Sequence, residues 1–148
     1  MQLAGPTLGS RSSHVVLDTD VTSYAFKHRD LPAPIVEAVL HNRLCITFVT
    51  LAELTKWSVR RKWSPAYQQR LDAWLANVLV LPYNNEIEDV ARTWGSLAAY
   101  AEERGRPRPQ NDMWVAACCI YYNLPLATLN IKDFRDFAEY EGLTIITK

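Results

Sequence analysis

Short apolar runs alternate along the chain with longer segments whose apolar residues recur at helical spacing. The runs predict β-strands at 14–17, 44–49, 79–81, 125–129 and 143–147. The periodic segments predict α-helices at 21–27, 33–41, 50–62, 65–78, 86–103 and 113–122, and a short one that ends near residue 140. This alternation indicates an α/β fold, a three-layer α/β/α domain with a central, mainly parallel sheet of four to five strands.

Several residues are expected to begin or end these helices. Thr50 is the expected N-cap of its helix, with Glu53 three positions later as in a capping box. Gly95 is expected to interrupt the long helix and Gly105 to end it. Asn111 is the expected cap of the helix that follows.

Length and composition indicate one domain. The chain has 148 residues, 49% of them hydrophobic, which is enough to bury a single core. We expect this domain to span residues 14–148 and residues 1–13 to form a loose tail. The 16 basic residues equal the 16 acidic ones, so a nucleic-acid partner would have to be bound by a local patch.

Cysteine content and hydropathy bear on the compartment. The three cysteines cannot all pair, and Cys118 and Cys119 are adjacent in an apolar helical segment, as small core residues are. No apolar run approaches the length that spans a bilayer. We therefore expect a reduced, cytoplasmic protein that is not associated with a membrane.

Acidic and amide side chains lie near the ends of the predicted elements. Asp18 ends the first strand, Glu53 is placed in the first turn of the helix after the second, and Asp112 opens the helix before the fourth strand. Asn130 and Asp133 directly follow that fourth strand. Such positions can share one edge of a parallel sheet, where ligands gather.

Acids brought together at such an edge require a counter-charge. Carboxylates a few ångströms apart repel by about 4 kcal/mol per pair at an intermediate dielectric. An all-oxygen set of ligands favours Mg²⁺ or Mn²⁺ as the cation that offsets this repulsion. Such an ion activates water and stabilises a phosphoryl oxygen, so the pattern predicts phosphodiester hydrolysis.

Each acid also has an interpretation without a metal. Glu53 could serve only as a capping-box acid, while Asp112 and Asp133 could be helix-start acids favoured by the macrodipole. Asp18 differs, because a carboxylate at the end of a buried strand is costly without a partner.

Four segments together resemble one family. These are LDTD at 17–20, TLAEL at 50–54, NDMWVAA at 111–117 and LPLATLNIKDF at 124–134. They resemble PIN-domain ribonucleases, specifically VapC-type toxins of bacterial toxin–antitoxin pairs, and the resemblance runs in order from His14 nearly to the C-terminus.

The resemblance implies a PIN-like fold and a metal-dependent endoribonuclease. Its catalytic and metal-binding residues would be Asp18, Glu53, Asp112 and Asn130, and its cofactor Mg²⁺ or Mn²⁺. It also implies an RNA substrate, a cognate antitoxin that neutralises the enzyme, and a homodimer.

Two positions depart from the family's usual form. Position 130 is Asn where many members have Asp, so the pocket would hold one negative charge fewer there. We expect a retained but weaker second metal site, to which Asp133 contributes through water. Asp20 occupies a position that is often Asn or Ser, and we expect it to orient Asp18 or Thr22.

Two basic clusters could bind RNA phosphates. One is Arg60, Arg61 and Lys62, flanked by Trp57 and Trp63, which could stack on bases. The other is Arg104, Arg106 and Arg108 in the predicted loop 104–110, which leads to Asp112 and is the better placed. A solvated loop is the alternative for the second cluster. Trp74 and Trp114 are expected in the core or a dimer interface.

Two other functions fit parts of the sequence. DTDVT at 18–22 also matches the opening motif of HAD-type phosphatases, with Asp18 as nucleophile and Asp20 as acid. That function needs a Lys and paired Asp residues later, which Lys132 and Asp133 imitate poorly. The third option is a non-catalytic PIN-fold protein that uses the groove only for binding.

Overall fold

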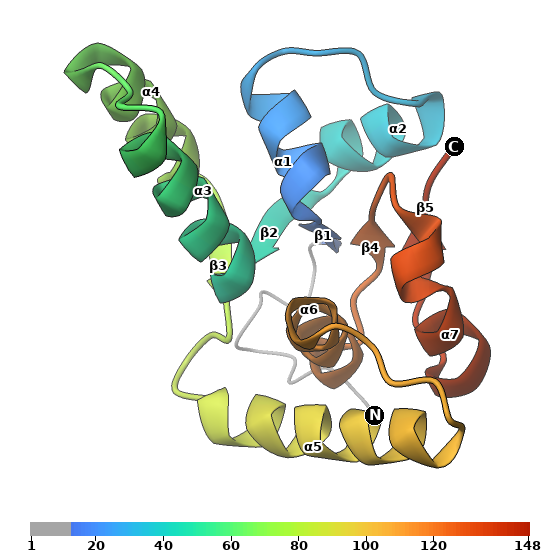
Figure 1. The fold of residues 1–148 in the computed structure, drawn as a ribbon. Coiled ribbons are helices and arrows are strands. Elements are labelled where there is room, and N and C mark those ends of the chain that lie inside the picture. Colours follow the sequence, from blue (N-terminus) through green and yellow to red (C-terminus); the bar gives the residue numbers. More distant parts are fainter. Residues whose placement is uncertain (1–12) are drawn as a thin grey trace.

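The computed structural model describes residues 13–148 and contains a five-stranded sheet in which every pair of neighbours is parallel (Figure 1). The strands are β1 (His14–Leu17), β2 (Arg43–Thr47), β3 (Leu79–Leu81), β4 (Leu126–Ala127) and β5 (Ile145–Ile146). Their order in the sheet is β3-β2-β1-β4-β5. The predicted α/β fold is confirmed. The predicted tail, apart from its last residue, lies outside the described residues.

Helices cover both faces of this sheet (Figure 1). On one face lie α1 (Thr19–Phe26) and α2 (Ala33–His41), and on the other lie α5 (Ile87–Glu103), α6 (Gln110–Tyr122) and α7 (Ile131–Glu141). The remaining two, α3 (Phe48–Arg60) and α4 (Pro65–Leu75), form a hairpin that projects from the sheet beside β3. Within residues 13–148, no helix combines the length and hydropathy that crossing a bilayer requires.

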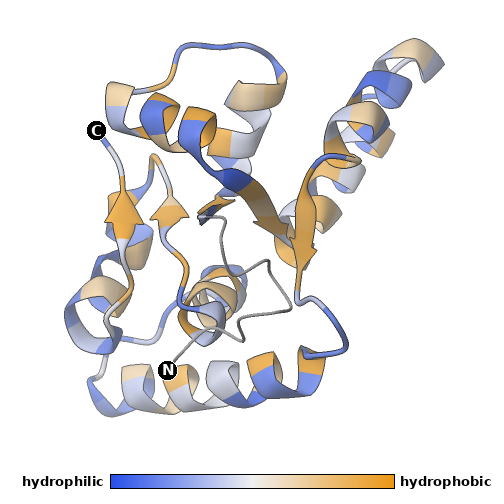
Figure 2. Cartoon of the chain, turned by 180° about the vertical axis from the view of Figure 1, so that it is seen from behind, coloured by the Kyte–Doolittle hydropathy of each residue, from blue (hydrophilic) through white to orange (hydrophobic). Residues whose placement is uncertain are grey.

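The alternation of side chains along each strand produces two hydrophobic cores. In β1, Val15 and Leu17 pack with α1 and α2, whereas Val16 packs on the opposite face with α6. All three are fully buried. The strands are accordingly among the most hydrophobic elements in Figure 2, as expected for a sheet covered on both faces.

The boundary between β2 and α3 differs from the prediction. The helix begins at Phe48 because Thr47 is its N-cap, whose hydroxyl accepts a hydrogen bond from the backbone N–H of Thr50 at 3.4 Å. Thr50 is therefore not the cap, and Glu53 lies in the second turn. The apolar run that resembled a strand continues into the buried first turn of the helix, so hydropathy did not mark the boundary.

Other predicted boundaries shift by a few residues. The helix α5 continues through Gly95, while Gly105 follows its C-cap with φ 70° and ends it as predicted. Asn111 is not a cap, because α6 already begins at Gln110. The two last strands are shorter than expected, two residues each.

The strand order determines where a site can form. The chain leaves β1 toward β2 on one side, and β4 lies on the other side of β1 and leads to β5. The carboxyl ends of β1 and β4 therefore flank a topological switch point, where open α/β sheets form a crevice. Asp18 follows β1 at this point, and Asn130 follows β4.

Tyr122 fixes the end of α6, the helix that carries Asp112. It is fully buried, and its hydroxyl accepts the backbone N–H of Tyr83 at 2.7 Å. We expect Tyr122→Phe to lower the free energy of unfolding by about 1–3 kcal/mol, because this N–H loses its partner. Urea denaturation measures the change, with Tyr100→Phe on the half-exposed face of α5 as the control. Equal losses in both variants would contradict it.

Candidate active site

A cavity of about 140 Å³ opens at the switch point between β1 and β4. Its walls come from the start of α1, from α3, from the start of α6 and from the segment after β4, and the lining residues are Asp18, Thr19, Asp20, Val49, Glu53, Trp57, Asn111, Asp112, Val115, Asn130 and Asp133. The structure thus brings all four predicted site residues together in one cavity. It adds Asp20, which was expected only to orient Asp18 or Thr22, and Trp57, which was expected beside the first basic cluster.

Asp18 is the N-cap of α1 and is held by two donors. Its Oδ1 accepts the backbone N–H of Thr19 at 2.8 Å, and its Oδ2 accepts the hydroxyl of Thr128 at 2.9 Å. Burial raises the pKa of this carboxyl, and the charges of Asp20 and Glu53 raise it further, whereas the two hydrogen bonds lower it. The carboxylate is therefore fixed in orientation, yet its charge is poorly compensated.

A short hydrogen-bonded chain orients Glu53. The hydroxyl of Thr19 donates to Glu53 Oε1 at 2.7 Å and lies 2.9 Å from the hydroxyl of Thr50. Because Thr19 has only one hydroxyl proton, Thr50 must be the donor in that second contact. The capping-box role predicted for Glu53 is thus wrong, since its carboxylate reaches across to α1 instead of back to its own helix.

Asp112 lies in the first turn of α6, as predicted. Burial raises its pKa to about 6, with further contributions from the charges of Asp133 and Asp18, while Arg108 acts in the opposite direction. A helix N-terminus favours a carboxylate. Burial and repulsion outweigh that preference here, so Asp112 is more than a helix-start acid.

Asp20 and Asn130 are partners across the cavity wall. The side-chain amide of Asn130 donates from Nδ2 to Asp20 Oδ2 at 2.8 Å, and its backbone N–H donates to the hydroxyl of Thr128 at 3.0 Å. Asp20 does not orient Thr22, whose hydroxyl donates to the backbone carbonyl of Asp18 at 2.9 Å. The sequence feature that indicates a place for Asp20 in the site is its spacing, since it follows Asp18 by two residues in the first turn of α1.

The chemistry of this donor set fits a hard divalent cation. It consists of carboxylate and amide oxygens, which Mg²⁺ and Mn²⁺ prefer, and burial followed by neighbouring negative charges raises the pKa values of Asp18 and Asp112. Within residues 13–148, no three His, Cys, Asp or Glu side chains already stand close enough to hold an ion. Binding would therefore have to draw these carboxylates together.

Two arginines of the loop that is predicted to bind RNA, the arginine loop, are paired with carboxylates. Arg104 donates to both carboxylate oxygens of Glu141, at 2.9 and 3.2 Å, and Arg106 to both oxygens of Asp136, at 2.8 and 3.1 Å. These bidentate pairs tie the α5–α6 connection to α7 and already match the charge of both arginines. Only Arg108 remains near the cavity, where its charge acts on Asp112.

Comparisons with known proteins agree with this geometry. The PIN domain family matches residues 15–140. Ribonuclease VapC1 of Haemophilus influenzae strain R2866 is 31% identical over 132 residues, covering 85% of this chain and 93% of the relative. Ribonuclease VapC5 of Mycobacterium tuberculosis is 33% identical over 129 residues, covering 86% and 87%.

A solved structure agrees as well. The crystal structure of VapBC-5 from Mycobacterium tuberculosis, a member of the VapBC family of toxin–antitoxin systems, superimposes with a TM-score of 0.66. It has 31% sequence identity and covers 92% of this chain and 99% of that one. The likeness therefore extends over nearly the whole of both chains.

The raised pKa of Asp112 predicts that the stability of the folded protein depends on pH. Its pKa is about 6 in the folded protein against a usual 3.8, so the folded state binds more protons between these values. Without metal, the free energy of unfolding should fall as pH rises from about 4 to about 6.5. In Asp112→Asn the free energy of unfolding should no longer fall over this range. At pH 7.5 the variant should be more stable than the wild type by about 1 kcal/mol, because solvent screens part of the effect.

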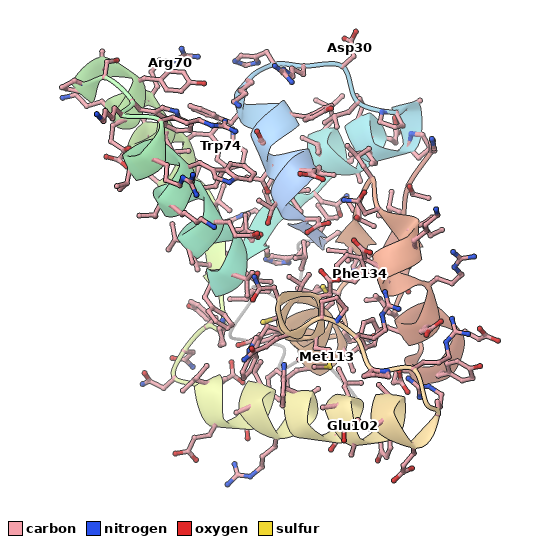
Figure 3. The ribbon with its side chains drawn as sticks, viewed as in Figure 1. Asp30, Arg70, Trp74, Glu102, Met113 and Phe134 are labelled. Carbon is pink, nitrogen blue, oxygen red and sulfur yellow. The ribbon has the colours of Figure 1, made fainter. Side chains whose placement is uncertain are left out.

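Urea denaturation in EDTA across this pH range measures the effect. Asp30→Asn is the matched control, since Asp30 lies on the exposed loop between α1 and α2 (Figure 3). A difference between wild type and Asp112→Asn that does not change with pH would contradict the raised pKa.

Proposed function

This chain belongs to the PIN domain family, and from that membership we propose that it is a metal-dependent endoribonuclease, the toxin of a toxin–antitoxin pair. The observation that supports this most directly is the cavity in which Asp18, Glu53 and Asp112 lie together, and in which burial and then neighbouring negative charges raise the pKa values of Asp18 and Asp112. Such a site favours a divalent cation, and a cation bound there would in turn attract the phosphoryl oxygens of a phosphodiester. The comparisons do not favour the HAD-type phosphatase or the non-catalytic binding protein.

Each residue has a distinct part in the proposed reaction. Asp18, Glu53 and Asp112 would hold Mg²⁺ or Mn²⁺, which supplies an activated water and stabilises charge on a phosphoryl oxygen. The hydroxyl of Thr128 keeps Asp18 directed into the cavity. The hydroxyl of Thr19 does the same for Glu53. These donors pre-orient the carboxylates, so that binding costs less rearrangement.

We also propose that Asp20 provides the charge that position 130 lacks. Asn130 is neutral, and one proton of its amide is used on Asp20 Oδ2. That hydrogen bond leaves the carbonyl oxygen of Asn130 and the second oxygen of Asp20 as neighbouring acceptors at the cavity. Asp20 and Asn130 would then each supply one oxygen to the ion, and Asp133 is a further acid in the lining.

A protein partner follows from the same proposal. The similar structure from Mycobacterium tuberculosis belongs to a toxin–antitoxin system. We propose that a cognate antitoxin likewise neutralises this enzyme. A homodimer stays a prediction from the family resemblance.

Cleavage of RNA tests the proposed activity. The wild type should cut a mixed pool of tRNA and rRNA with Mn²⁺ and not with EDTA. Asp18→Asn and Asp112→Asn should each lose at least about 100-fold in rate, because a charged ligand of the ion is replaced by a neutral one. Gel analysis of the products measures this, with Asp30→Asn as an active control and thermal melting to verify folding. RNA cleavage that persists in EDTA would contradict the proposed dependence on a metal ion. Turnover of a small phosphomonoester would instead support the phosphatase.

An exchange of charges tests the pair of Asp20 and Asn130. Asp20→Asn should weaken Mn²⁺ binding on the order of tenfold, and Asn130→Asp should strengthen it. The double variant Asp20→Asn/Asn130→Asp keeps the number of carboxylates and should bind Mn²⁺ nearly as the wild type does. Calorimetric titration measures these affinities independently of activity. An unchanged affinity in Asp20→Asn would remove Asp20 from the site, and an unchanged one in Asn130→Asp would remove Asn130.

A further inference from the structure

Positive charge gathers on the α3–α4 hairpin and at the end of α1. Between Glu53 and Asp72 the sequence has five basic residues and no acidic one, although the whole chain has no net charge. Three cations of this region lie over aromatic rings, and a fourth, Lys27, is affected by the charges of two of them. We call these four the basic hairpin surface: Lys27, Arg29, Arg61 and Arg70. Within residues 13–148, none of these four forms a salt bridge.

The like charges of this surface act on one another. The pKa of Lys27 is lowered by burial and then by the charges of Arg61 and Arg29. The contrast with the arginine loop is clear, because Arg104 and Arg106 are matched by carboxylates. Concentrated positive charge without an internal partner attracts a polyanion.

Aromatic rings lie beneath some of these cations and form cation–π contacts with them. The guanidinium of Arg70 lies 5.7 Å from the centre of the Phe26 ring and 5.3 Å from that of Tyr67. Phe26 is in turn packed against Trp63 and Trp74, with ring centres 6.3 and 6.4 Å apart. In Figure 3, Trp74 lies between the hairpin and α1, whereas Arg70 lies near the outer end of α4. These rings are committed to packing, so they hold the cations at the surface.

The basic hairpin surface is continuous with the catalytic cavity. Glu53, Trp57 and Arg61 are spaced four residues apart along α3 and therefore lie on one side of it, over about 12 Å. Trp57 lines the cavity beside Glu53, and the guanidinium of Arg61 lies 5.5 Å from the centre of its ring. A nucleic-acid strand that leaves the cavity along α3 would thus pass the half-buried ring of Trp57 and then reach the cations.

We propose that the basic hairpin surface binds the phosphate backbone of single-stranded RNA next to the scissile bond, with Trp57 as a stacking platform for one base. This inference rests on the proposed function, because it takes the cavity as the place of cleavage. Cations beside an aromatic ring form the usual binding surface for single-stranded nucleic acid. Charge complementarity and continuity with the cavity favour RNA over an acidic segment of a protein partner.

Binding of a fluorescent single-stranded RNA, followed by anisotropy from 50 to 300 mM salt, tests the proposal. All proteins carry Asp112→Asn so that the RNA is not cut. Adding Lys27→Gln and Arg61→Gln should raise the Kd on the order of tenfold and reduce the salt slope by about 1.4, since about 0.7 is lost per phosphate contact. Arg92→Gln on α5, an exposed arginine paired only with Glu88, is the matched control and should change neither.

Trp57→Leu should weaken binding without changing the salt slope, because stacking releases no counterions. An unchanged salt slope in Lys27→Gln/Arg61→Gln would overturn the proposal. It would also be overturned if this variant bound poly-glutamate more weakly and RNA as before, because the surface would then belong to a protein partner. Cleavage by the wild type separates the two hypotheses. If it cuts RNA and the slope is unchanged, only the surface is wrong, whereas no cutting contradicts the proposed function itself.

Discussion

Repulsion between carboxylates at the switch point is the constraint on which the site depends. Asp18 and Asp112 approach the same cavity from different elements, burial raises the pKa of both, and the charge of Asp18 raises that of Asp112 further. The fold holds two of the acids in place through neutral donors, the hydroxyl of Thr128 on Asp18 and that of Thr19 on Glu53. These donors orient the carboxylates without cancelling their charge, as the proposed cation site would require.

Charges elsewhere in the molecule are also distributed unevenly. The acids of α7, Asp136 and Glu141, are satisfied by arginines from the α5–α6 connection, which anchors α7 next to α6. The basic hairpin surface has no such partners among the described residues. A chain with no net charge is therefore acidic at one cavity and basic beside it, as the proposed binding and cleavage of a polyanion would require.

Local pattern predicted much of this arrangement. Strands with buried side chains on both faces and helices with apolar stripes are encoded within a few residues, so the order of elements followed from the sequence. Boundaries were less well predicted where hydropathy continued across them, as between Thr47 and Phe48. The hydroxyl of Thr47 ends that strand by capping a helix whose first turn is as apolar as the strand itself.

By itself, the sequence determined the α/β fold and the acids after its strands, because these depend on the spacing of nearby residues. Only the tertiary structure decided which polar groups meet. Asn130 and Asp20 are 110 residues apart and became partners because β4 lies beside β1 in the sheet. Arg104 and Arg106 likewise form ion pairs because α7 presents carboxylates to them. Such contacts follow from strand order and helix packing, which short-range periodicity does not encode.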